Sequence, residues 1–155
     1  MKNLLLFASL ILSSTPALAA QVGYCMGVED FKQGHLATKK FANGKILVTS
    51  VDTDGEPVCC SHHMMIQVKT PQGLICFLVS QKMGDGKDVY PTGYAQIDFD
   101  QLNASYEEGK GLHLKVPVYT YDFDNKNGGN PVPAGTAHAL VNQHSPVSVR
   151  IIKDE

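Results

Sequence analysis

The sequence has no excess of positive charge. Lysine and arginine number 13 against 15 aspartates and glutamates, for a formal net charge of −2. The only charged residue among the first 19 is Lys2, so the remainder of the chain is slightly more acidic still. This balance gives no electrostatic reason to bind nucleic acid or an anionic membrane surface. We therefore expect no nucleic-acid partner.

Long apolar runs and catalytic signature motifs are also missing. The longest apolar run, residues 4–12, is far too short to span a bilayer, so we expect no membrane span in the mature form. The nucleophile elbow of serine hydrolases, the helical histidine pair of zinc proteases and the Gly-rich loops that bind phosphate are absent. No internal repeat or coiled-coil heptad is present. The motifs therefore give no reason to expect an enzyme.

Residues 1–19 have the organisation of an export signal. A weakly basic start containing Lys2 precedes the apolar run, and Pro16 and the small-residue pattern of residues 17–19 follow it. A signal peptidase would cut such a sequence before Ala20. We predict a cleaved signal peptide, residues 1–19, and a single globular β domain, residues 20–155, of a bacterial protein that is periplasmic or secreted. Disulfides form and persist in that compartment.

From Lys45 onward the sequence consists of short strand patterns separated by turn residues. Residues 64–69 and the apolar residues 74–79 flank the turn sequence Thr-Pro-Gln-Gly, which predicts a hairpin with a central second strand. Further strands are predicted at residues 46–51, 94–100, 112–121, 137–141 and 147–152. Only residues 28–41 have helical character, which Gly34 weakens. The pattern favours a mainly β fold: an antiparallel β-sandwich or barrel of about 6–8 strands, at most one short N-terminal helix, stapled by disulfides.

Alternation of apolar and polar residues also predicts which side chains face the core. In residues 112–121 the inward side chains would be Leu112, Leu114, Val116 and Val118. Pro117 cannot donate a hydrogen bond to a neighbouring strand, which indicates an edge strand or a bulge at that position. Ala95, Ile97 and Phe99 would face inward from residues 94–100.

Four cysteines, Cys25, Cys59, Cys60 and Cys76, make an even number in an oxidising compartment and predict two disulfides. Three pairings are open. A bond between the neighbours Cys59 and Cys60 requires a strained ring and is rare. The other two pairings would link Cys25 and Cys76 to the segment before Met64, and such a bridge would stabilise the domain by about 2–4 kcal/mol.

A metal site is the alternative interpretation of the segment around these cysteines. The segment contains soft and borderline donors that suit copper(I), namely Cys59, Cys60, His62, His63, Met64 and Met65. Neighbouring residues of a strand face opposite ways, so one ion could gather them all only if the segment looped. Cysteines in disulfides cannot ligate. A periplasmic copper-binding protein is thus the alternative function, whereas the favoured function expects no cofactor.

A cysteine-dependent hydrolase is the third hypothesis. Its nucleophile would be Cys25, which precedes the predicted helical segment, and its base would be His113 or His138. An unpaired Cys25 would leave three cysteines, an odd number for an exported protein. The favoured function therefore has no intrinsic catalysis.

A recognition surface is the favoured functional feature. If residues 112–118 face the core as predicted, two tyrosines lie on the opposite face beside an Asp- and Asn-rich loop. The candidate surface comprises Tyr119, Tyr121, Asp122, Asp124, Asn125 and Asn127. Tyrosine buries contact area at little entropic cost, and loops on rigid scaffolds often carry recognition. We expect a binding protein with a protein or glycan partner, as for secreted effectors that act in virulence, inhibitors and immunity-type proteins.

The same loop, residues 122–128, begins like a calcium-binding loop. Lys126 stands where an oxygen ligand should be, and the glycine comes one place late. A solvated loop is therefore favoured over a calcium site.

Overall fold

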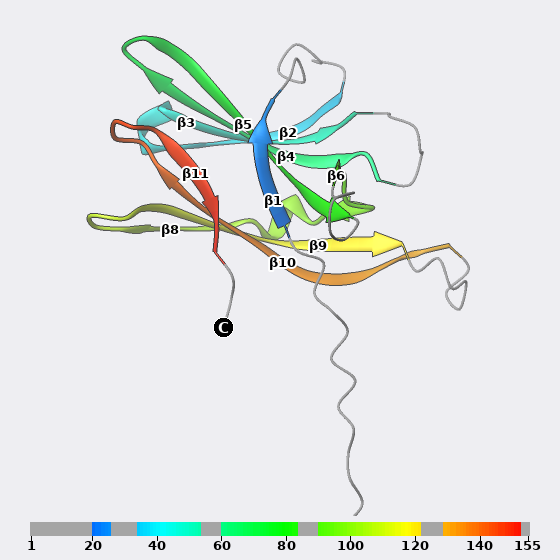
Figure 1. The fold of residues 1–155 in the computed structure, drawn as a ribbon. Helices are drawn as coiled ribbons and strands as arrows, with labels where there is room; N and C mark the ends of the chain where they lie inside the picture. Colours follow the sequence, from blue (N-terminus) through cyan, green and yellow to red (C-terminus); the bar gives the residue numbers. More distant parts are fainter. Residues whose placement is uncertain (1–19, 26–33, 54–59, 84–89, 122–128, 153–155) are drawn as a thin grey trace, which may run out of the picture.

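The computed structural model describes residues 20–25, 34–53, 60–83, 90–121 and 129–152. These residues form eleven strands in two antiparallel sheets, with two short 3-10 helices (Figure 1). The predicted fold class, an antiparallel and mainly β domain, is confirmed, and the two-sheet arrangement is that of a sandwich. The strands outnumber the six to eight expected, because several short ones lack alternating apolar residues. The predicted signal peptide lies outside the described residues.

The first sheet has the strand order β1-β5-β4-β3-β2, and β6 also pairs with β5. Its strands are β1 (Ala20–Tyr24), β2 (His35–Phe41), β3 (Ile46–Asp52), β4 (His62–Thr70), β5 (Gly73–Met83) and β6 (Tyr90–Thr92). A 3-10 helix, η3 (Ala42–Gly44), joins β2 to β3. The predicted hairpin is confirmed as β4 and β5, and β5 is central as expected, between β1 and β4, with β6 pairing its last residues on the side opposite β1.

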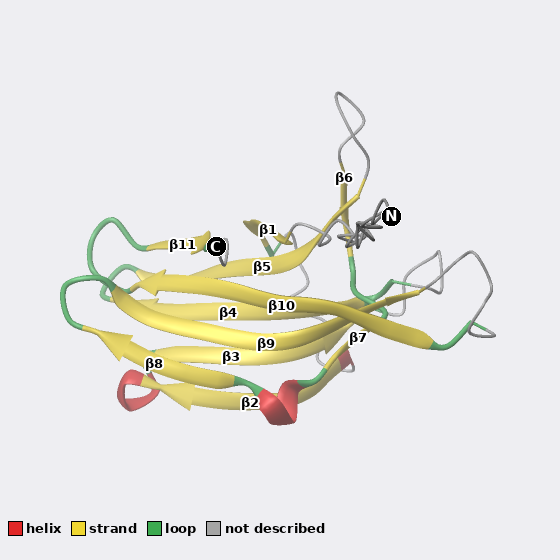
Figure 2. Ribbon diagram, turned by 90° about the horizontal axis from the view of Figure 1, so that it is seen from below, coloured by secondary structure: helices red, strands yellow, loops and turns green. Residues whose placement is uncertain are grey.

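The second sheet has the order β11-β10-β9-β7, with β8 pairing the same side of β9 as β7. Its strands are β7 (Gln96–Ile97), β8 (Asn103–Glu107), β9 (Gly111–Tyr121), β10 (Pro131–Asn142) and β11 (Ser148–Ile151). The 3-10 helix η4 (Phe99–Gln101) lies between β7 and β8. Figure 2 shows the two sheets stacked, with their long strands running in the same general direction.

One hydrophobic core lies between the sheets. All four residues predicted to face inward from β9 are buried there, as are Met64, Ile66 and Val68 of β4. Full burial of such a side chain contributes roughly 1.5–3 kcal/mol. A second, smaller cluster of Cys25, Val51 and Met65 lies on the opposite face of the first sheet. The alternation of strand residues therefore divides the apolar side chains between two separate clusters.

The helical expectation for residues 28–41 is wrong over its described part, because residues 35–41 form strand β2. Antiparallel pairing with β3 satisfies the backbone hydrogen-bonding groups of this segment. Local residue propensity does not reveal such a pairing. Residues 28–33 lie outside the described residues. In residues 94–100 only Gln96 and Ile97 are paired as a strand, although Ala95, Ile97 and Phe99 are buried as predicted.

Pro117 lies in a central strand rather than an edge strand. On one side β9 pairs with β10, and on the other side its pairing with β8 ends at Lys115 and its pairing with β7 begins at Val118. Pro117 faces the gap between those two short strands, and its carbonyl accepts a hydrogen bond from the Asp98 N–H at 3.0 Å. Because no strand pairs with β9 at Pro117 on that side, the absence of a backbone N–H at Pro117 breaks no hydrogen bond of the sheet.

Lys39 of β2, in the first sheet, contacts helix η4, which lies between two strands of the second sheet. Its Nζ donates to the carbonyl oxygens of Phe99 at 2.8 Å and Asp100 at 3.3 Å, and it lies 5.2 Å from the centre of the Phe99 ring. A cation over an aromatic face is attracted electrostatically. No helix among the residues described is long and apolar enough to cross a membrane.

Candidate functional site

The end of the sandwich that carries the β4–β5 turn also carries the β10–β11 turn, and a groove lies between them. In the first turn the Thr70 hydroxyl donates to the Gly73 carbonyl at 2.8 Å and accepts from the Gln72 N–H at 3.2 Å. Gly73 has a φ of +132°, which few other residues adopt. These local bonds fix the turn and the direction of Leu74 and Ile75, which follow it.

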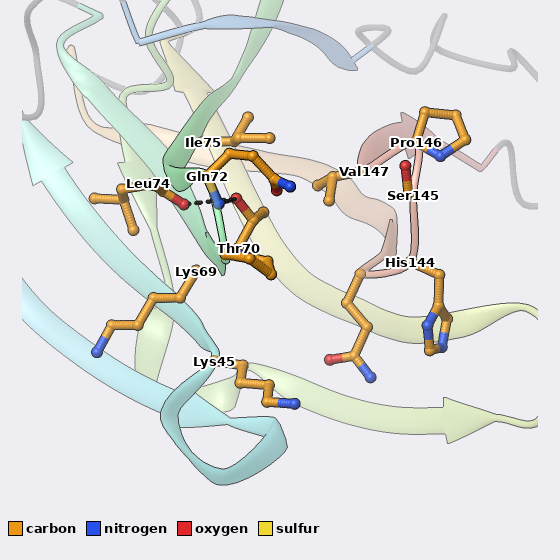
Figure 3. A pocket seen from close by; sticks show the side chains of 13 residues that line it. Lys45, Lys69, Thr70, Gln72, Leu74, Ile75, His144, Ser145, Pro146 and Val147 are labelled. Carbon is orange, nitrogen blue, oxygen red and sulfur yellow. Dashed lines mark hydrogen bonds between the residues drawn. The ribbon is translucent and has the colours of Figure 1, made fainter.

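The β10–β11 turn is held by Asn142 in a similar way. The Asn142 side-chain oxygen accepts from the His144 N–H at 3.1 Å, and its amide nitrogen donates to the Pro146 carbonyl at 3.3 Å. An asparagine that bonds its own following backbone is a common turn device. The turn thereby contributes His144, Pro146 and Val147 to the lining of the groove, with Val147 nearest to the first turn (Figure 3).

The groove between the two turns has a volume of about 790 Å³. Its apolar lining residues are Pro71, Leu74, Ile75, Pro146 and Val147, and its basic ones are Lys45, Lys69 and His144. Figure 3 shows the side chains of β4 and β5 on one side and those of the β10–β11 turn on the other. A concave, mostly apolar surface with a few polar groups is the usual form of a binding site.

A second hollow of about 480 Å³ adjoins the first and shares Lys45 and Gln143 with it. It opens between the edge of each sheet, lined by Phe41 of β2 and by Ala104 and Tyr106 of β8, with core residues Ile46, Leu112 and Val141 also lining it. Tyr106 is exposed, although it is a large aromatic residue. We call the two hollows together the end groove.

The lining of the end groove carries charge of one sign. Lys45 and Lys69 line it, and no aspartate or glutamate does. The two lysines lie on neighbouring strand ends, since the Lys69 N–H donates to the Lys45 carbonyl at 2.8 Å. None of the ion pairs formed among the described residues involves either lysine. The groove is thus locally basic in an acidic chain, which favours an anionic occupant.

Gln143 lies where the two hollows meet. Its side-chain oxygen is buried and has no hydrogen-bond partner within the described part of the chain. A buried acceptor without a donor costs about 1–3 kcal/mol. A ligand that supplied an N–H or O–H at this junction would recover that cost.

The predicted tyrosine surface lies at the other end of the sandwich. Tyr119 and Tyr121 are half-buried on the face of β9 that points away from the core, as the alternation predicted. Leu112 of the end groove is nine residues from Tyr121 along the same strand, which corresponds to about 30 Å. The other proposed members, Asp122, Asp124, Asn125 and Asn127, and the calcium-like loop lie outside the described residues. The tyrosine surface therefore stays a prediction.

The cysteine pairing differs from both pairings that the sequence favoured. Cys25 forms a disulfide with Cys76, at a Cα–Cα distance of 5.5 Å. The reason is strand pairing, because Tyr24 of β1 lies opposite Phe77 of β5 and so brings the next residues together. Bridges from Cys25 or Cys76 to the segment before Met64 are therefore wrong. Cys60 is buried, and Cys59 lies outside the described residues.

The same disulfide removes the nucleophile of the proposed hydrolase. The Cys25 sulfur is bonded and buried on the outer side of the first sheet. The two proposed bases lie on the outer side of the second sheet, where His113 Nδ1 and His138 Nε2 are 3.0 Å apart and His113 Nε2 donates to Glu107 at 3.1 Å. Hydrogen bonding to Lys110 is the largest cause that lowers the pKa of Glu107. The structure brings together the two histidines but not the cysteine, and a disulfide-bonded Cys25 is not available as a nucleophile.

The proposed copper ligands are divided between the faces of β4. Met64 is buried in the main core, whereas Met65 is buried in the second cluster. His62 lies 3.9 Å from Asp52, and His63 Nδ1 lies 2.9 Å from the Ser80 hydroxyl on the other face. Among the residues that the structure describes, no group of three or more His, Cys, Asp or Glu side chains could hold a metal ion. The copper hypothesis required the segment to loop, whereas residues 62–65 are extended as part of β4.

His63 and Ser80 form a buried pair that has the residue types of a catalytic dyad. Ser80 is buried, and burial is the largest cause that lowers the pKa of His63 to about 4. Tyr94 covers the pair from the core side of the sheet, since its hydroxyl donates to the Ser80 carbonyl at 3.2 Å, and burial raises the pKa of Tyr94 well above its ordinary value. Neither hollow of the end groove includes these residues. The pair is thus buried in the sheet and lies outside the end groove.

The sequence did not point to the end groove, although it predicted one of its turns. The two turns are 70 or more residues apart, and only the stacking of the sheets brings them together. The signal available in the sequence was Tyr106, a single aromatic residue in a polar stretch, which the structure shows to be exposed. No protein-family model, curated protein or solved structure matches this chain.

Proposed function

We propose that this protein is an exported binding protein without catalytic activity, and that its partner docks in the end groove. The observation that carries the proposal is the groove itself, an apolar channel across the end of a rigid sandwich with Lys45 where its two hollows meet and Lys69 in the first hollow. A groove held by two braced turns changes little on binding, which lowers the entropic cost of association. The disulfide supports an oxidising location, periplasmic or secreted.

Protein is favoured over glycan as the partner. The walls of the groove are mainly aliphatic, and Phe41 and Tyr106 are the aromatic residues that line it. Apolar side chains of a protein fit such walls, and exposed apolar patches on a stable domain commonly mark protein interfaces. An effector, inhibitor or immunity-type protein would use the groove to capture a second protein.

The test is site-specific photocrosslinking in the bacterium that exports the protein. A photoreactive amino acid replaces Leu74, an exposed residue at the rim of the groove, and Leu36 and Tyr121 are the matched positions outside it. We expect one adduct of defined mass at position 74 and none at position 36. The purified partner should then bind the wild-type protein and lose affinity when Lys45→Glu is introduced.

Two results would contradict the proposal. Equal crosslinking at positions 74 and 36 would show random encounters. A specific adduct at position 121 alone would move the binding site to the predicted tyrosine surface.

A further inference from the structure

We infer that the occupant of the end groove is a short extended peptide segment whose acidic residues are flanked by apolar ones. This inference rests on the proposed function and specifies the chemistry of the partner. It follows from the order of the chemical groups along the groove, the edges of the two sheets beside it, and the sign of its charge.

The groove presents apolar, basic and apolar surface in sequence. Leu74, Ile75 and Val147 line the first hollow, and Phe41 and Tyr106 line the second. Lys45 lines both hollows and Lys69 lines the first; their backbones are hydrogen-bonded, and their amino groups point apart (Figure 3). A segment with one or two carboxylates between apolar side chains would place its charges at the lysines and its apolar groups in the hollows.

The walls of the groove are open to solvent along their length. Several of the lining side chains are exposed, including Lys45, Lys69, Leu74, Tyr106 and His144. Sites for small molecules are usually enclosed enough to bury most of the ligand. An open channel that joins two hollows fits an extended chain better than a compact ligand.

The second hollow lies between two edge strands. β2 pairs only with β3, and β8 pairs only with β9, among the strands that the structure describes. All five residues of β8 are exposed, none is proline, and the one charged residue, Glu107, lies at the end of the strand and pairs with Lys110 and His113. An extended peptide beside β8 would find backbone hydrogen-bonding groups there, as in recognition by strand addition. Small anions and lipid headgroups could accept from the N–H groups but could not also donate to the carbonyl oxygens as an added strand does.

The experiment selects peptides from a phage-displayed library of random hexapeptides on the disulfide-bonded full-length protein. The matched proteins are the double variant Lys45→Glu/Lys69→Glu and the single variant Lys40→Glu, whose lysine is exposed on β2 outside the groove. Selected peptides are synthesised with a fluorophore, and their dissociation constants are measured by anisotropy at two salt concentrations. Anionic vesicles and single-stranded DNA are tested as competing ligands.

We expect wild-type protein and Lys40→Glu to enrich the same peptides, with Asp or Glu between aliphatic or aromatic residues. The double variant should bind them at least about tenfold more weakly, and replacing Asp and Glu by Asn and Gln in the peptide should have a similar effect. Affinity should fall as salt is raised.

Enrichment of neutral or basic peptides, or equal binding by the double variant, would overturn the inference. So would the absence of any enriched peptide, or preferential binding of vesicles or DNA. A specific crosslink at position 74 combined with any of these results would leave the proposed function standing and refute only the acidic peptide. No specific crosslink at position 74 would refute the proposed function itself.

Discussion

Acidification should destabilise this protein through His63. The His63 side chain is buried, with 8% of its surface exposed, and burial is the main cause that lowers its pKa from 6.5 to about 4. The neighbouring charge of His62 acts in the same direction, and Asp52 opposes both. In the unfolded chain the imidazole would titrate near its ordinary pKa. The unfolded state therefore binds more protons than the folded state between pH 6.5 and pH 4.

The sign and size of the effect follow from that difference. Above pH 6.5 the imidazole is neutral in both states and contributes nothing. As the pH falls from 6.5 to 4 the unfolded state gains the proton first, so the free energy of unfolding decreases. A shift of about 2.5 units corresponds to a loss of roughly 3 kcal/mol near pH 4, and about 2 kcal/mol of it is lost by pH 5.

Urea unfolding followed by circular dichroism at pH 7 and pH 5 measures this loss. The wild-type protein is compared with His63→Gln and with a control, His144→Gln, whose histidine is exposed. Between the two pH values we expect His63→Gln to lose about 2 kcal/mol less than wild type, and the control to behave like wild type. A His63 imidazole that titrates near pH 6.5 by NMR, or equal pH dependence in His63→Gln, would refute the reasoning.

Three further predictions concern the fold. Replacing both cysteines of the disulfide (Cys25→Ser with Cys76→Ser) should lower the free energy of unfolding, measured in urea titrations, by about 4 kcal/mol, because the bond closes a loop with a sequence separation of 51. A decrease below about 1 kcal/mol would contradict this prediction. Gly93→Ala should prevent accumulation of folded protein, since the added methyl group would overlap the Cys60 carbonyl; a normal near-ultraviolet spectrum would show that the backbone adjusts. Tyr94→Phe should cost about 1 kcal/mol in thermal unfolding, because the Ser80 carbonyl loses a donor, and an unchanged Tm would indicate that another donor replaces it.

The parts of the fold that the sequence predicted are those governed by local patterns. Alternating residues identified the inward face of β9, and the Thr-Pro-Gln-Gly turn identified the β4–β5 hairpin. Strand β8 has no such pattern, because all five of its residues are exposed. Strand β2 was mistaken for a helix because its pairing with β3 is a tertiary contact that propensity does not encode.

The candidate site could not be predicted for a related reason. Its walls come from β2, β4, β5, β8 and the β10–β11 turn, and no local signal states that these segments meet. The cysteine pairing failed in the same way. The number and spacing of the cysteines left more than one disulfide pairing open. The pairing of β1 with β5 determined that the sulfurs of Cys25 and Cys76 are adjacent.

The Cys25–Cys76 bond has a practical consequence for anyone who produces the protein. Cys76 follows directly after Leu74 and Ile75, so the bond anchors the same strand that forms one wall of the end groove. Protein made in the reducing cytoplasm of an expression host would carry that wall on a strand joined to β1 by backbone pairing alone. Material for binding measurements should therefore be expressed with export or refolded under oxidising conditions, and its thiol content should be checked before any negative binding result is accepted.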